Sequence, residues 1–143
     1  MKLRTGLLAG AVAGVLSGAP STIHALVKGQ DPLAATRAAG NVVLPAAAKP
    51  ASLFLAGAAV HVALSIGWGT VLSVVLPRTS PHAVARGAAA GLAMAAIDLG
   101  LIAHGLGRRR MVLVRGLPVL PQVADHVAFG VVAGVVIARA DRG

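Results

Sequence analysis

The 143-residue chain lacks cysteine and has only four acidic residues and 2% aromatic residues. The absence of cysteine excludes disulfide bonds and thiolate metal sites. The net charge of +9 could indicate a nucleic-acid partner, but the aromatic side chains on which bases stack are missing from the basic segments. We therefore expect no nucleic-acid binding. The sequence contains no GxSxG, HExxH, P-loop or paired acidic motif, so it predicts no particular catalytic reaction.

Charged residues are also scarce, at 12% of the chain against about 25% in a soluble domain. Hydrophobic residues make up 57%, and a helix needs about 20 apolar residues to cross a bilayer core of about 30 Å. Four stretches satisfy this requirement, namely residues 3–27, 51–76, 84–106 and 119–138. The sequence therefore predicts one all-α domain over residues 1–143, an integral membrane four-helix bundle in contact with lipid.

The first apolar stretch also resembles a secretory signal peptide, because a basic start precedes an apolar run and small residues. However, its segment LAGAVAGV at 8–15 has a counterpart in ARGAAAGL at 85–92, which aligns Gly10 with Gly87. A leader that is removed needs no such counterpart. We expect the first span to be retained.

A second internal similarity relates AVHVALSIGWGTV at 59–71 to ADHVAFGVVAGVV at 124–136, with six of thirteen positions identical. It aligns His61 with His126. Together the two similarities predict two repeated helical hairpins. Because a repeat of two spans keeps its orientation, the hairpins should be related by a pseudo-twofold axis along the membrane normal.

Glycine recurs at every fourth position of the first span, and in shorter runs in the third and fourth. In lipid, small residues let helix backbones approach closely. This glycine-zipper pattern predicts tight packing inside the bundle or at a homo-oligomer interface. The residues are Gly6, Gly10, Gly14, Gly18, Gly87, Gly91, Gly130 and Gly134. Pro20 lacks an N–H group and should kink or end the first helix near its exit.

The connection after the first span contains an expected interfacial segment at 31–44. Asp31 is a good N-cap and Pro32 suits the first helical position, so a short helix over 32–39 should lie at the surface. Arg37 would then be solvated or close over the bundle.

Basic residues are balanced between the two expected sides of the membrane, six against seven, so the positive-inside rule decides no orientation. The terminal side has Lys2, Arg4, Arg78, Arg86, Arg139 and Arg142, and the other side has Lys28, Arg37, Lys49, Arg108, Arg109, Arg110 and Arg115.

Polar residues of the spans gather in the half away from the termini. They are Ser21, His24, His61, Ser65, Asp98, His104, Asp125 and His126. A carboxylate within a span costs about 2.5 to 3.5 kcal/mol, so Asp98 should face the interior and pair, with His126 as the expected partner. His61 and Ser65 share a helix face. Asp125 should lie in the first turn of its helix, where the helix dipole favours an acid.

This polar set has three interpretations. It could fix helix register by hydrogen bonds, or couple function to protonation, since histidine titrates near neutrality. Neither requires a cofactor. Alternatively, His61 and His126 could ligate haem b or a metal, in an accessory subunit of a membrane complex. The sequence thus predicts a small membrane protein that responds to protons or transports a small solute, with the cofactor-binding or structural subunit as the alternative.

The chain has a glycine-rich first helix, HVALSIGWG at 61–69, Pro77, RGAAAG at 86–91, HGL at 104–106 and ADHVAFG at 124–130. From about residue 51 onward this succession resembles the YagU-like family of bacterial inner-membrane proteins. The resemblance implies a multi-pass inner-membrane protein with cytoplasmic termini. The resemblance also implies a link to acid tolerance, which is suggested for that family.

Overall fold

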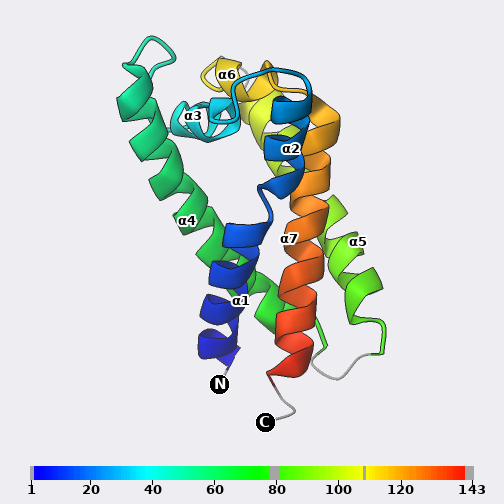
Figure 1. Cartoon of the computed structure of the whole chain (residues 1–143). Helices are drawn as coiled ribbons and strands as arrows, with labels where there is room; N and C mark the ends of the chain where they lie inside the picture. Colours follow the sequence, from blue (N-terminus) through cyan, green and yellow to red (C-terminus); the bar gives the residue numbers. More distant parts are fainter. Residues whose placement is uncertain (1, 78–80, 108, 141–143) are drawn as a thin grey trace.

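The computed structural model describes residues 2–77, 81–107 and 109–140, so Arg78, Arg108 and Arg142 lie outside the described residues. The described chain is helical and contains no strand, which confirms the predicted all-α architecture. The elements are α1 (Lys2–Leu16), α2 (Ala19–Val27), α3 (Ala34–Gly40), α4 (Pro50–Val75), α5 (Ala83–Ala95), the π-helix η1 (Ala96–Leu106), α6 (Val112–Arg115) and α7 (Val119–Arg139) (Figure 1).

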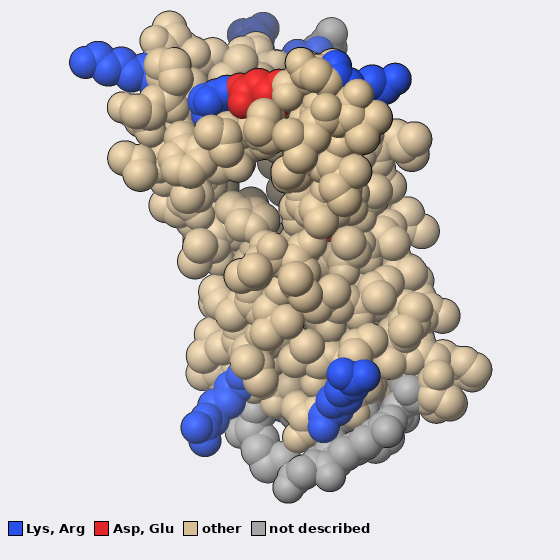
Figure 2. Space-filling view, viewed as in Figure 1, with Lys and Arg blue, Asp and Glu red and all other residues tan. Residues whose placement is uncertain are grey.

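Four helical stretches of the described chain are long and apolar enough to cross a membrane, at Lys2–Val27, Pro50–Val75, Ala83–Gly105 and Val119–Arg139. Both termini lie at one end of the molecule, and α3 and α6 lie at the other (Figure 1). On the face drawn in Figure 2, Lys and Arg side chains lie at the two ends and leave the band between them free of basic groups. The chain is therefore a small multi-pass membrane protein.

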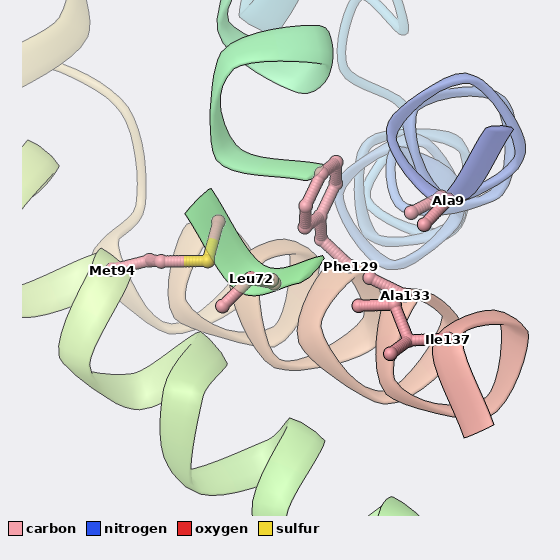
Figure 3. Packing of buried hydrophobic residues seen from close by; sticks show 7 residues of the cluster. Ala9, Leu72, Met94, Phe129, Ala133 and Ile137 are labelled. Carbon is pink, nitrogen blue, oxygen red and sulfur yellow. The ribbon is translucent and has the colours of Figure 1, made fainter. Parts of the chain in front are cut away.

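The spans pack in two pairs, α1 against α4 and α5 against α7. The contact between α1 and α7 joins the pairs, whereas the described parts of α4 and α5 have no comparably extensive contact. A buried core, shown in Figure 3, receives side chains from α1, α4, α5 and α7. Its members are Ala9, Ala13, Leu72, Met94, Phe129, Ala133 and Ile137.

Glycines lie at both pair contacts. A Cβ atom added at Gly6 would lie 2.7 Å from the Cα of Thr70, and one at Gly91 would lie 2.7 Å from the Cα of Val127. These distances are shorter than any ordinary carbon contact, so a side chain there would push the helices apart. Gly18 differs, because an added Cβ would have no atom within 4 Å. Gly18 therefore makes no close helix contact within the described chain, and its place at a homo-oligomer interface stays a prediction.

The first span is discontinuous. Helix α1 ends at Leu16 and α2 begins at Ala19, since Pro20 cannot donate a backbone hydrogen bond to the carbonyl of Leu16 and its ring clashes with the preceding turn. The sequence predicted a break near the exit of this span, whereas the break lies near its middle. The third span changes from α-helix to π-helix at Ala96, which the sequence did not predict.

The segment before the second span corrects a further expectation. Helix α3 begins at Ala34 rather than Pro32, and Asp31 accepts a hydrogen bond from the N–H of Leu33 (2.9 Å) just before the helix. Ala38 is only 2% exposed, and the backbone of Gly57 on α4 contacts α3 closely. One face of α3 is therefore buried in the bundle, and the helix does not simply lie on the surface. Arg37 forms an ion pair with Asp31.

Candidate functional site

Three spans meet at the carboxylate of Asp98 on η1. Nε2 of His126 on α7 lies 3.3 Å from Oδ2 of Asp98, and Nε1–H of Trp68 on α4 donates to the same oxygen at 3.0 Å. The contact between Asp98 and His126 is the pair predicted from the sequence. Trp68 was missed, although an indole N–H in an apolar span needs an acceptor and was an available signal.

The hydrogen bonds of His126 determine how many protons this pair holds. Nδ1 lies 2.8 Å from the backbone carbonyl oxygen of Gln122, which can only accept, so Nδ1 carries a hydrogen. Nε2 faces the carboxylate of Asp98, and their hydrogen bond requires a second proton on one of the two groups. The pair is then either imidazolium with carboxylate or imidazole with carboxylic acid. In both forms the pair binds one proton between Nε2 and Oδ2.

Both partners are shielded within the bundle, with side-chain exposures of 20% for His126 and 19% for Asp98. The acidic groups within electrostatic range of His126 are Asp98 and Asp125, and Asp125 directly precedes His126 in the chain. Because an unpaired carboxylate within a span is costly, the shared proton and the Trp68 bond together stabilise Asp98 at this depth.

Asp125 projects from α7 to a different partner. Its Oδ1 accepts a hydrogen bond from the backbone N–H of Ser21 at 2.9 Å. Ser21 lies in the first turn of α2, where backbone N–H groups have no partner within the helix. The expectation that Asp125 serves the start of its own helix is therefore wrong, because α7 begins at Val119 and Asp125 caps α2.

His61 holds the other side of the same break. Its Nε2 lies 2.8 Å from the carbonyl oxygen of Gly14, in the last turn of α1, and donates to it. Ser65 lies on the same face of α4, since a Cβ at Gly14 would contact it at 2.8 Å. Thus α4 and α7 supply one polar side chain each to the two ends of the broken span.

The remaining predicted residues lie apart from the Asp98 pair. Nδ1 of His104 bonds to the carbonyl of Leu99 within η1 (2.6 Å). His24 and Ser21 line a pocket of about 270 Å³ between α2, the segment before α3 and the start of α7. The predicted polar set is therefore divided among the Asp98 pair, the two ends of the break and this pocket.

The haem alternative requires a free Nε2 atom on both His61 and His126. In this structure each of these atoms contacts a protein oxygen, so ligation would have to replace two hydrogen bonds. Within the described ranges, no group of three or more His, Asp or Glu side chains is arranged to hold a metal ion. Haem ligation by His61 and His126 would therefore cost both of these hydrogen bonds, and the haem alternative stays a prediction for spectroscopy.

Asn41 is a buried polar residue that the sequence analysis missed. It is 3% exposed, its side-chain oxygen accepts from the N–H of Leu113 (3.1 Å), and its amide donates to the carbonyl of Leu44 (2.9 Å). These bonds join the end of α3 to α6. They satisfy backbone groups that a buried loop would otherwise leave unpaired.

Comparison of the chain with family models, curated proteins and solved structures found no match. The functional interpretation therefore rests on the geometry of the polar sites.

Proposed function

We propose that this membrane protein binds and releases one proton at the Asp98–His126 pair within the bilayer, and responds to pH through it. The observation that carries the proposal is that both ring nitrogens of His126 face oxygen atoms. Those two hydrogen bonds can exist together only while the pair holds its proton.

Release of this proton has a structural consequence. A neutral imidazole beside an ionised Asp98 can donate to the carboxylate or to the carbonyl of Gln122, but not to both. One bond is lost, and a side-chain hydrogen bond between membrane helices contributes about 0.6 to 1.7 kcal/mol. Since Asp98 also bonds Trp68, the loss alters how η1 is held between α7 and α4. Proton binding is thereby coupled to helix packing, as a pH-responsive protein or a small proton-coupled transporter requires.

The proposal includes an internal repeat. Gly69 packs against the backbone of Gly10, and Gly134 packs against that of Gly87. The sequence alignment matches Gly10 with Gly87, and the aligned histidines match Gly69 with Gly134. The same register of contact in the two pairs supports their origin as repeated hairpins.

The interruptions of the first and third spans support a functional site at this level. The alignment of Gly10 with Gly87, continued at the same offset, matches Ser21 with Asp98. Ser21 follows the break between α1 and α2, and Asp98 follows the change from α5 to η1. The adjacent residues Asp125 and His126 on α7 bond one to each. Interrupted helices near the middle of the bilayer are where many transporters form binding sites.

The membrane in which the protein works is a further part of the proposal. Its resemblance to the YagU-like family favours a bacterial inner membrane with cytoplasmic termini, and the link of that family to acid tolerance agrees with a proton-binding pair.

The test uses Trp68, because it is the single tryptophan in a chain without tyrosine, so intrinsic fluorescence reports on this site alone. In nanodiscs, the emission of Trp68 should show a pH transition. We expect Asp98→Asn and His126→Gln to abolish the transition while the helix content measured by circular dichroism is retained. His82→Gln, at an exposed histidine just before α5 and outside the pocket, is the matched control for His126→Gln and should leave the transition of the protein unchanged. An unaltered transition in both site variants would refute the proposal.

A further inference from the structure

The pocket at the end of the bundle away from the termini has direct bonds to the polar site. Ser21 and Gln122 line it. The N–H of Ser21 is bonded to Asp125, and the carbonyl of Gln122 accepts from Nδ1 of His126. One hydrogen bond, from Nδ1 of His126 to the carbonyl of Gln122, therefore links the pocket wall to the proton-binding pair, and another links the wall to Asp125.

The pocket has a mixed lining, in which five of the thirteen residues are polar and the other eight are Ala, Pro, Gly and Leu. Polar side chains come from α2, from the segment before α3 and from α7, and they are Ser21, His24, Gln30, Asp31 and Gln122. The volume of about 270 Å³ accommodates several water molecules, since each occupies about 30 Å³ in the liquid. A buried water needs about two to four hydrogen-bond partners, and the five polar side chains of the lining can supply them.

The terminal end of the bundle has a different arrangement. Ala9, Ala13, Ala133 and Ile137 are 0% exposed in the core, and a second pocket of about 560 Å³ is lined by Lys2, Ser73 and residues 74–77. Within the described part of the chain, no hydrogen bond joins a lining residue of this second pocket to Asp98 or His126. Of these two pockets, the one at the α3 and α6 end therefore has the lining that is bonded to the polar site.

We infer that this pocket is a hydrated vestibule that delivers protons to the Asp98–His126 pair from the α3 and α6 side of the membrane, an inference that rests on the proposed function. The titratable groups along this route are His24 and Asp31 in the pocket and Asp125 behind Ser21. His61, from α4, is within electrostatic range of Asp125 and completes the set around it. In this conformation the pair exchanges protons with the α3 and α6 side.

The accessibility of the pocket to a thiol reagent can be measured directly, because the chain has no cysteine and a single-cysteine variant reacts only at the introduced residue. Ser21→Cys keeps the backbone N–H that bonds Asp125, and Gln122→Cys keeps the carbonyl that accepts from His126. In proteoliposomes, both variants should react with a charged, membrane-impermeant thiol reagent added on the α3 and α6 side. Ala133→Cys should react more slowly by on the order of tenfold or more, because a packed core position reacts only after local opening. If neither pocket variant reacts faster than Ala133→Cys, the vestibule is closed and the inference is wrong.

Delivery of protons is tested by a pH jump followed through Trp68 fluorescence. The thiol-labelled Ser21→Cys protein should reach the same final emission as its unlabelled form, but more slowly. Ser52→Cys, an exposed serine at the start of α4 outside the pocket, is the matched control and should respond at the original rate after labelling. If labelling at Ser21→Cys leaves the rate unchanged, protons arrive by another route and the inference fails. If the unlabelled protein has no fluorescence transition although the pocket variants react, the proposed function is wrong. The inference about proton delivery rests on that function and is then wrong as well.

Discussion

Two glycines of the first span, Gly14 and Gly18, have equivalent places in the sequence pattern but opposite surroundings in the structure. A Cβ at Gly14 would lie 2.7 Å from Oγ and 2.8 Å from Cβ of Ser65, whereas one at Gly18 would have no atom within 4 Å. The pair of variants Gly14→Ala and Gly18→Ala therefore separates the effect of helix contact from the effect of removing a glycine.

The magnitude follows from the distances. To restore an ordinary carbon contact at Gly14→Ala, α1 and α4 must separate by roughly 0.7 Å, and overpacking of this kind costs about 1 to 3 kcal/mol. The same movement stretches the 2.8 Å bond from His61 to the carbonyl of Gly14 beyond hydrogen-bond length. Its loss adds about 0.6 to 1.7 kcal/mol. Greater helix propensity returns up to about 1 kcal/mol, so the net destabilisation is about 1 to 4 kcal/mol.

Gly18→Ala should be neutral or stabilising by up to about 1 kcal/mol, because the site has room and the backbone (φ −78°, ψ 0°) suits alanine. The assay is equilibrium unfolding in mixed detergent micelles, followed by circular dichroism. Equal free energies of unfolding for the two variants would show that the contact at Gly14 does not hold α1 against α4.

Three further outcomes are expected. Gly10→Leu should lower the melting temperature in detergent far more than Leu7→Ala, because Gly10 is buried against α4 whereas Leu7 is 41% exposed. Equal melting temperatures of the two variants would place the glycines against lipid. Asp125→Ala removes the acceptor for the N–H of Ser21 and should destabilise the protein by about 0.5 to 2 kcal/mol, measured by the same unfolding assay, where no change would mean that another group caps α2. The proton shared by Asp98 and His126 stabilises the folded state while it is bound, and the pair loses this proton as pH rises. Asp98→Asn should therefore reduce the slope with which the unfolding free energy decreases with pH. An unchanged slope would contradict this expectation.

The predictable part of the site followed from the cost of charge in lipid. An Asp in the middle of an apolar span must find a partner, and Asp98 was correctly assigned to His126 because both were expected at similar depth. The same reasoning indicates that the indole N–H of Trp68 needs an acceptor, but it could not identify Asp98 as that acceptor. The hydrogen bond of Trp68 depends on how α4 crosses η1, and that crossing is not encoded in the residues near Trp68.

The outcome at Asp125 and His61 was less predictable. Both are polar residues near an expected cluster, yet each bonds a backbone group of the first span rather than another side chain. The sequence indicated through Pro20 that this span is interrupted. It could not indicate which neighbouring helices satisfy the freed N–H and carbonyl groups, since that depends on which faces of α4 and α7 meet the break.

The sequence by itself determined the four spans, because any run of about 20 apolar residues in lipid must satisfy its backbone hydrogen bonds within a helix. It also determined that Asp98 needs a partner. Only the tertiary structure decided that Gly14 is a contact and Gly18 is not, that α3 is partly buried in the bundle, and that Asp125 and His126 bond different spans. The physical reason is that hydrophobicity is a local property of each segment, whereas helix contacts in lipid depend on the rotation and crossing of whole helices, which residues far apart in the chain fix together.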